Sequence, residues 1–426
     1  MISSKPPSGM RDTLPNELRK KEQIINQIKQ IFEKFNYDPI DTPALERIEV
    51  LNGKFSSQEE NEKLIFQIQK RGDKSEEGSD LGLRYDLTVP LSRFYTEYQN
   101  DLPKVFKRYC IDKVWRAERA GRGRFREFYQ CDIDTIGSSS NLVEVETFLA
   151  LAQALKCFNL KNLSLKISSR DFLKKFLESF GIVDLKTFMT CLDKQDKIGF
   201  DGVLEELKSK DFDETISKNI LKILSNESDF ENYCKDKPEI LTIINQINAI
   251  MALARPFLSD INIYFCKTLV RGFDYYTSTI FEFYSPDLGS TIAGGGRYDS
   301  LTSIFNGNKT PACGGSIGIE RIFGLLDDQE IQNEKKSVLI ALFDDTMKGD
   351  CLELLKFLTD NNINSEIYLS ADKLGDQIKY AVSKNCQYLI INGPDEKAKG
   401  ILTVKNLISK EQVEVKKDDL LSILKF

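Results

Sequence analysis

Apolar side chains near the N-terminus recur at helical spacing. Over residues 18–35, Ile and Phe stand every three or four positions, which predicts one buried face of an amphipathic helix. Pro43 ends that pattern, because proline fits neither a helix interior nor a central strand. From residue 64 to 136 short runs alternate apolar and polar residues, the clearest at 128–134. This alternation predicts an antiparallel sheet with one functional face, and residues 141–157 read as a further helix.

The pattern becomes helical and acidic in the middle of the chain. Residues 171–260 hold 12 basic and 17 acidic residues, a net charge of −5, and predict an inserted helical domain. Strands are expected again at 261–265 and 280–284. A glycine-rich turn at 294–296 and a helix opening around 318–326 are expected to follow.

The last part of the chain follows a polar linker at 327–336. Beyond it, strand patterns at 338–343, 366–369 and 388–391 alternate with helical patterns that run to about 360 and about 384. The βαβαβ order predicts a small α/β domain that folds independently. We therefore expect a domain at 1–327, interrupted by the helical domain at 171–260, and a second domain at 335–426.

Composition narrows the chemistry that these domains can perform. The 426 residues include no histidine, and the nine cysteines form no C-x-x-C pair. Catalysis by Ser–His–Asp or Cys–His groups, zincin sites and facial-triad iron sites are thereby excluded, and Ser316, in a G-x-S-x-G sequence, has no conventional base. Neither a Walker nor a Rossmann glycine pattern occurs. We expect no metal site and no tightly bound cofactor.

Cysteine usage and hydropathy indicate the compartment. Scattered, unpaired cysteines are typical of a reducing cytosol. The first residues lack the apolar core of a secretory signal, and no apolar run approaches the roughly 20 residues that span a bilayer. We expect a cytoplasmic protein without a membrane segment. Because the net charge is −6, any nucleic-acid binding must use a local basic patch.

The densest chemical signal is a run of five arginines and two glycines at 116–126. Guanidinium groups grip phosphate in a planar fork, and glycine allows a tight loop close to a ligand. Arg271 stands beside Gly272, and Arg321 follows Gly318. Three such elements converging on one sheet indicate a polyphosphate site, whereas a solvated basic hairpin is the plainer interpretation of 116–126 alone.

These segments resemble the motifs of histidyl-tRNA synthetases, which are class II aminoacyl-tRNA synthetases, over essentially the whole chain. The resemblance covers class II motif 1 in the helix before 41–43, motif 2 at 113–119 and 123–130, motif 3 at 318–322, and two histidine-binding signatures at 269–276 and 295–299. Residues 83–90 and 193–197 resemble the eukaryote-like branch of the family. The part around 373–381 resembles an anticodon-binding domain.

The resemblance implies a fold and an activity. The fold would be an α+β catalytic domain with an antiparallel sheet, an inserted helical domain and a C-terminal α/β anticodon-binding domain. The activity would be ATP-dependent ligation of L-histidine to tRNA(His) through a histidyl-adenylate, releasing AMP and diphosphate. ATP would enter with Mg²⁺, and motif 1 implies a homodimer.

The resemblance also implies roles for individual residues. ATP would be bound by Arg116, Glu118, Arg124, Phe128 and Arg321. Histidine would be bound by Asp86, Thr88 and Gln130 at its α-ammonium group, by Asp134 and Tyr276 at its imidazole, and by Arg271, Tyr275 and Tyr298. Arg271 and Arg116 would be catalytic, stabilising the charge that builds at the α-phosphate. Such a reaction needs no general base, because the attacking carboxylate is already ionised.

Two positions depart from the family pattern, and two alternative functions remain open at this point. Cys110 and residues 168–170 differ from what the family often shows there. A catalytically silent paralogue that acts as a regulatory subunit or amino-acid sensor, or a class II enzyme for another amino acid, would keep some of the same motifs. Without histidine, only a perturbed cysteine or the α-amino group is expected to titrate near pH 7, so the substrate imidazole, with a pKa near about 6.5, should set the acid limb of activity.

Overall fold

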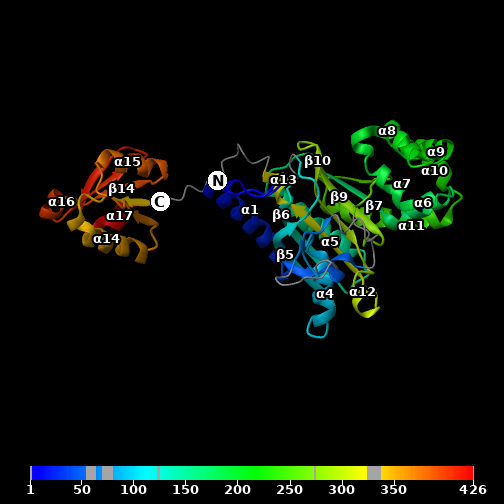
Figure 1. Cartoon of the computed structure of the whole chain (residues 1–426), viewed down its shortest axis with the longest axis horizontal. Coiled ribbons are helices and arrows are strands. Elements are labelled where there is room, and N and C mark those ends of the chain that lie inside the picture. Colours follow the sequence, from blue (N-terminus) through cyan, green and yellow to red (C-terminus); the bar gives the residue numbers. More distant parts are fainter. Residues whose placement is uncertain are drawn as a thin grey trace. The chain divides into compact units, whose positions relative to one another are not determined.

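The chain separates into two compact units, Met1–Gln329 and Glu330–Phe426 (Figure 1). The structure, a computed structural model, describes residues 2–53, 64–69, 80–121, 125–272, 275–323 and 337–425. The expected linker at 327–336 lies outside the described residues. Each unit has a hydrophobic core of its own.

An eight-stranded sheet forms the centre of the first unit, in the order β1-β5-β6-β11-β10-β9-β7-β8. The strands are β1 Asp38–Pro39, β5 Phe106–Trp115, β6 Glu127–Ile136, β7 Ser164–Ser169, β8 Asn262–Phe265, β9 Thr279–Ser285, β10 Ser290–Arg297 and β11 Ala312–Gly318. All neighbours are antiparallel except the edge pairs β1–β5 and β7–β8. The antiparallel sheet predicted from the alternation at 128–134 is thus confirmed.

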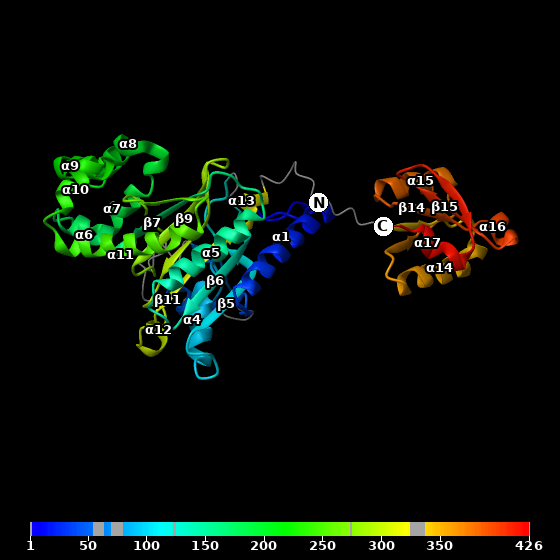
Figure 2. The ribbon, with the colours of Figure 1, turned by 180° about the vertical axis from the view of Figure 1, so that it is seen from behind.

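Two helices cover one face of this sheet, α1 (Pro15–Lys34) and α5 (Leu142–Lys156) (Figure 2). Proline at the first position of α1 loses no helical hydrogen bond there, and the buried stripe of α1 includes Ile24, Ile28 and Phe32. Under α5, Phe148 meets Phe281 of β9 edge to face, with ring centroids 4.7 Å apart. The helix pattern at 18–35 therefore marks a buried face, and α5 confirms the helix expected at 141–157.

The opposite side of the sheet carries smaller elements. A three-stranded sheet, β2-β4-β3, is made of Leu45–Arg47, Leu81–Leu83 and Gln67–Ile68. Helix α2 (Ile48–Asn52) packs against helix α4 (Thr88–Tyr98). The short helix α12 (Ser303–Asn306) packs against α4, whereas α13 (Ile319–Phe323) contacts α1 through an ion pair between Glu320 and Lys21. These elements place residues 86–88 at the sheet.

The glycine run at 294–296 forms the middle of strand β10, so the turn expected there was wrong. A Cβ on Gly295 would lie 2.0 Å from the carbonyl oxygen of Gly314 on β11, and one on Gly294 would lie 2.6 Å from Nη1 of Arg271. Glycine is needed here for close approach rather than for chain reversal. The reversal between β9 and β10 instead ends at Gly289, whose φ is +57°.

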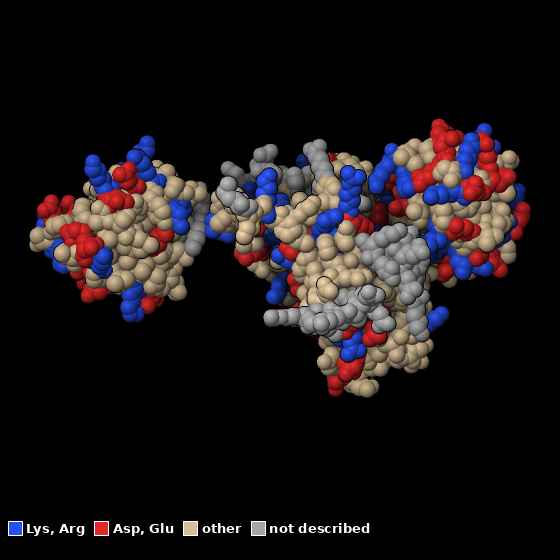
Figure 3. Space-filling view, in the orientation of Figure 1, with Lys and Arg blue, Asp and Glu red and all other residues tan. Residues whose placement is uncertain are grey.

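Residues 170–254 form six helices around a separate core. They are α6 Arg170–Glu178, α7 Leu185–Leu192, α8 Gln195–Ser209, α9 Glu214–Ser225, α10 Glu227–Cys234 and α11 Pro238–Ala254, and the short 3₁₀ helix Arg255–Phe257 follows. Their core is rich in aromatic rings, including Phe172, Phe176 and Phe230. Figure 3 shows acidic and basic side chains interspersed over the surface of these helices.

One helical span among the described residues, Pro238–Phe257, is long and apolar enough by length and composition to cross a membrane. The expectation that no run approaches that length was wrong by this measure. The span is weak support for a membrane segment, because core helices pass the same test. Here α11 packs against α5, α6, β7 and β8.

The second unit is a five-stranded sheet in the order β13-β12-β14-β15-β16. The predicted strands are β12 Val338–Ile340, β13 Ser365–Ile367 and β14 Tyr388–Ile391, and they pair in parallel. The predicted helices are α14 Lys348–Asp360 and α15 Leu374–Ser383. Strands β15 (Leu402–Asn406) and β16 (Gln412–Val415) extend the sheet with antiparallel pairs, which the sequence analysis did not anticipate. The short helices α16 (Pro394–Lys399) and α17 (Leu420–Ile423) complete the unit.

Candidate active site

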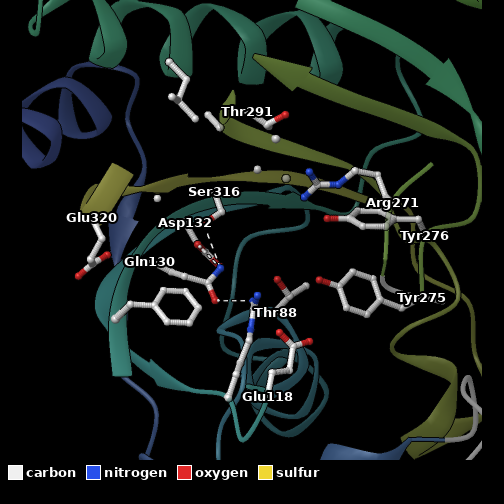
Figure 4. A pocket seen from close by; sticks show the side chains of 18 of the residues that line it. Thr88, Glu118, Gln130, Asp132, Arg271, Tyr275, Tyr276, Thr291, Ser316 and Glu320 are labelled. Atoms are coloured by element: carbon white, nitrogen blue, oxygen red, sulfur yellow. Dashed lines mark hydrogen bonds between the residues drawn. The ribbon is translucent and has the colours of Figure 1, made fainter. Parts of the chain in front are cut away.

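A cavity of about 310 Å³ opens in the first unit, over strands β6, β10 and β11 (Figure 4). Gln130, Asp132 and Asp134 line it from β6, because side chains two positions apart point to the same face of a strand. Gly294, Gly314 and Gly315 of β10 and β11 line it as well. An added Cβ on Gly294 or Gly314 would point toward Arg271 or Asp134, so these two glycines leave space that a ligand would need, whereas Gly315 lines the cavity with its backbone and faces Leu151 and Phe281 on the other side of the sheet.

One wall of the cavity is built around Arg116, which follows β5. Its Nε donates to the carbonyl oxygen of Tyr85 at 3.1 Å, and its Nη2 donates to Oε1 of Gln130 at 3.4 Å. The guanidinium group also lies 4.9 Å from the ring centroid of Phe128. Glu118, exposed at the mouth, completes this wall. The side chain of Arg116 is therefore fixed from several sides.

Arg271 lies at another wall of the cavity (Figure 4). Its Nη1 lies 2.7 Å from Oε1 of Glu282 on β9, and the other carboxylate oxygen of Glu282 accepts from the hydroxyl of Thr291 at 2.6 Å. An arginine held by a carboxylate stays charged and is pre-organised for an anionic ligand.

Three buried carboxylates lie close together beside these arginines. Burial raises the pKa of Asp86 to about 6, although the Val89 amide, Arg116 and Tyr275 act in the opposite direction. Burial also raises the pKa of Asp132 to about 7, against the charge of Arg108. Besides a perturbed cysteine and the α-amino group, these two buried carboxyl groups are therefore candidates to titrate near pH 7.

Asp134 is the most strongly paired of the three carboxylates. Its Oδ2 lies 2.6 Å from Nη2 of Arg108, and both side chains are buried. Its Oδ1 accepts from the hydroxyl of Tyr298. Burial raises the pKa of Asp134, and Arg108 and Tyr298 oppose that rise. A carboxylate has about four acceptor positions, so Asp134 retains capacity for one more donor.

Three tyrosines close the remaining side. The rings of Tyr275 and Tyr276 have centroids 4.8 Å apart, and those of Tyr275 and Tyr298 lie 6.0 Å apart. Tyr275 extends toward Thr88 and Tyr276 lies against Arg271 (Figure 4). Burial raises the pKa of Tyr276 in spite of Arg271, so its hydroxyl is neutral and able to donate.

Most of the residues predicted for the site line this one cavity. They are Thr88, Arg116, Glu118, Phe128, Gln130, Asp134, Arg271, Tyr275, Tyr276 and Tyr298. Asp86 is buried two positions before Thr88 and is not among the lining residues. Arg124 lies outside the described residues. Arg321 lies in helix α13, but the position of its side chain is likewise outside the description.

Sequence reasoning missed four residues that shape the cavity. Asp132 lines it, Glu282 pairs with Arg271 and accepts a hydrogen bond from Thr291, and Arg108 pairs with Asp134. Alternation along β6 could have identified Asp132, since it stands between Gln130 and Asp134. The others depend on pairing between distant segments. Within the described ranges, no group of three or more Cys, Asp or Glu residues is arranged to hold a metal ion.

Comparisons with known proteins agree with this geometry. A family model described as histidyl-tRNA synthetase matches residues 9–322, and one described as anticodon binding domain matches residues 336–426. The histidine–tRNA ligase of Phocaeicola vulgatus is 34% identical, with 100% of both chains covered. That of Gloeobacter violaceus is 33% identical over 96% of this chain and 95% of its own. The crystal structure of histidyl-tRNA synthetase from Nostoc sp. PCC 7120 superposes with a TM-score of 0.78 at 26% identity, covering 100% of this chain and 99% of the other.

Fold and site together define an aminoacyl-tRNA synthetase of class II. Within that class, the chain belongs to the histidyl-tRNA synthetase family. The predicted fold class is confirmed, including the C-terminal α/β anticodon-binding domain, and so is the activity of a histidine–tRNA ligase.

Proposed function

We propose that this cavity joins L-histidine to ATP and then passes the histidyl group to tRNA(His). One observation supports the proposal above all. Arg116 and Arg271 line the same cavity, and each is held by contacts with other protein groups. Gln130, Asp134 and Tyr276 line that cavity too. In the first step the histidine carboxylate attacks the α-phosphorus, an oxygen–phosphorus bond forms, and diphosphate leaves. In the second step a ribose hydroxyl of the tRNA attacks the carbonyl carbon and AMP leaves.

The arginines stabilise the first step. Negative charge builds on the oxygens of the pentavalent phosphorus, and Arg116 and Arg271 supply donors that are already in place. Phe128 stacks on the adenine and Glu118 accepts from its amino group. The motif resemblance assigns Arg124 and Arg321 to the γ-phosphate of ATP, which enters as its Mg²⁺ complex. These ATP roles rest on the motifs and on the wall that Arg116, Phe128 and Glu118 form.

The polar groups of β6 and α4 select histidine. Its α-ammonium group has three N–H donors, and Asp86, Thr88 and Gln130 offer acceptors for them. Asp134 accepts from one imidazole nitrogen and Tyr276 donates to the other. Tyr298 keeps the Asp134 carboxylate in position through its hydroxyl, and Tyr275 lies against Thr88. A site built to bind polar atoms rejects analogues that lack them, since its own groups are then left unpaired.

The test of this function is pyrophosphate exchange measured with each of the twenty amino acids. Exchange with histidine alone is expected. Exchange with a different amino acid would favour another class II specificity, and no exchange at all would favour a regulatory paralogue. A catalytically silent paralogue is the weaker alternative, because Arg116 and Arg271 are both present in the cavity.

We further propose an assembly and a location. Motif 1 in α1 supports a homodimer, and α1 leaves Leu18 exposed, with Leu14 beside it. The nine unpaired cysteines support the cytoplasm. The anticodon-binding domain at 335–426 would contact tRNA. The motifs at 83–90 and 193–197 support a relationship to the eukaryote-like branch, while the relatives reported above are bacterial. Mass measurement in solution tests the dimer.

The Asp134→Asn variant should lose histidine recognition while ATP binding is kept. An amide is a weaker acceptor and can present its NH₂ group toward the imidazole. We expect the histidine KM to rise about tenfold or more and the ATP KM to stay unchanged in pyrophosphate exchange. Removing one partner of the buried Arg108–Asp134 pair also costs about 3–5 kcal/mol of stability, so thermal unfolding is measured alongside.

The milder Tyr298→Phe variant serves as the companion to Asp134→Asn. It removes one donor to Asp134 and leaves the ion pair with Arg108 in place. A histidine KM that is unchanged in both variants, with the Asp134→Asn protein folded, would exclude Asp134 from the imidazole site.

The activity should fall on the acid side through protein carboxylates. Asp86 and Asp132 have pKa values of about 6 and about 7, and each carries the charge that favours the α-ammonium group only above its pKa. Lowering the pH through this range protonates them, so kcat/KM for histidine should decrease below about pH 7. This replaces the expectation that the substrate imidazole alone sets the acid limb.

A ring-fluorinated histidine of much lower imidazole pKa separates the two causes. With this analogue part of the acid limb should remain in place. In the Asp132→Asn variant the upper ionisation should disappear, which leaves a decrease only below about pH 6. An acid limb that moves entirely with the analogue would show that the carboxylates do not control it.

A further inference from the structure

The N-terminal segment before α1 reaches the hairpin that forms the Arg116 wall of the cavity. The carbonyl oxygen of Gly9 accepts from the backbone N–H of Arg126 at 2.7 Å. The carbonyl oxygen of the same Arg126 accepts from the backbone N–H of Arg116 at 2.9 Å. The backbone of one residue, Arg126, thus joins the N-terminal segment to the arginine assigned to the α-phosphate.

The side chain of Arg126 adds a second connection. Its Nε donates to the carbonyl oxygen of Glu118 at 2.9 Å, and its Nη1 donates to that of Ser8 at 3.4 Å. Glu118 lines the mouth of the cavity. Arg126 therefore binds both arms of the hairpin and the N-terminal segment at once.

Arg11 makes the third connection. Its guanidinium carbon lies 4.6 Å from the ring centroid of Phe125, which lines the cavity. Its Nη1 also lies 3.0 Å from Oε1 of Glu17 in α1. Arg11 thereby links the tip-side part of the hairpin to a helix that is packed on the sheet.

We propose that residues 8–11, here called the N-terminal clasp, are a positioning element for ATP. The clasp holds the hairpin on which Arg116, Glu118 and Phe128 are presented, and it does not touch the histidine side of the cavity. This inference rests on the proposed ATP roles of those residues. Misplacing a binding group by about 1 Å is enough to cost a large factor in rate, so a clasp at the base of the hairpin has a measurable effect.

The backbone of Gly9 explains why the clasp needs this residue. Its φ is +80°, a conformation that side chains other than glycine rarely adopt, and an added Cβ would lie 2.8 Å from Cγ of Arg126 and 3.0 Å from Cβ of Ala120. Arg126 cannot move aside without losing its bonds to Ser8 and Glu118. A methyl group at position 9 should therefore displace the hairpin.

The experiment compares Gly9→Ala with Gly181→Ala in pyrophosphate exchange. Gly181 has a φ of +78° and no atom within 4 Å of an added Cβ, so it carries the same backbone strain without a clash. We expect the ATP KM of Gly9→Ala to rise about tenfold, the histidine KM to change less than about twofold, and Gly181→Ala to behave as the parent. Arg11→Gln, which imposes no backbone strain, should raise the ATP KM in the same selective way if Gly9→Ala does not fold.

Two results would overturn the clasp. One is an ATP KM in Gly9→Ala and Arg11→Gln equal to that of Gly181→Ala, and the other is an equal rise of both KM values. Phe128→Ala, measured in the same assay, identifies which assignment has failed. If Phe128→Ala raises the ATP KM and the clasp variants do not, only the clasp is wrong. If none of them changes it, the ATP roles of the hairpin are wrong as well.

Discussion

Replacing Arg271 by alanine should slow adenylate formation by about 10²–10³-fold while histidine binding stays nearly intact. In its proposed role Arg271 contacts charge that is present in full only in the transition state, so its loss is expected to affect the rate more than the ground-state complex. Its ion pair with Glu282, 2.7 Å long, and the close approach of Gly294 fix the guanidinium before ATP arrives. The measurement is single-turnover adenylate formation with saturating histidine.

A second variant distinguishes the loss of transition-state stabilisation from repulsion of ATP by an unpaired Glu282. Arg271→Ala leaves Glu282 partly buried with Thr291 as its remaining hydrogen-bond donor among the contacts described, and that negative charge could itself repel ATP. Combining Arg271→Ala with Glu282→Gln removes the stray charge. If Arg271 stabilises the transition state, the double variant stays slow. Recovery of the rate in the double variant, or wild-type turnover with only a raised histidine KM in the single one, would contradict the role.

The sequence predicted the sheet and most of the cavity because both depend on local patterns. Alternation along β6 predicts a polar face, and short motifs locate Gln130, Asp134 and Arg271 in the chain. These signals need only neighbouring residues. They are therefore readable before any strand has been paired with another.

Pairing between distant strands accounts for what the sequence did not show. Three consecutive glycines resemble a turn, yet Gly295 is required because Gly314 of β11 approaches it across the sheet. The partner of Asp134 is Arg108 on the neighbouring strand β5, where the two residues are directly opposite each other. That register follows from the whole sheet. The raised pKa of Asp132 has the same origin, because burial is its largest cause.

Removing residues 335–426 should leave adenylate formation unchanged and strongly reduce the charging of full-length tRNA. The predicted ATP and histidine residues described in the structure lie in the first unit, whereas 336–426 match an anticodon binding domain. The core around Val338, Leu354 and Tyr388 is made of residues of the second unit alone.

The size of this effect follows from how that domain can hold RNA. Residues 335–426 contain 14 lysines, no arginine and 14 acidic residues, so general attraction to phosphate is weak and contacts must be local. Losing about 3 kcal/mol of such contacts would lower kcat/KM for tRNA roughly 100-fold. A minihelix that carries only the acceptor stem is the control, and both proteins should charge it equally. If the folded, truncated protein charges intact tRNA as well as the full chain, the domain has a different role.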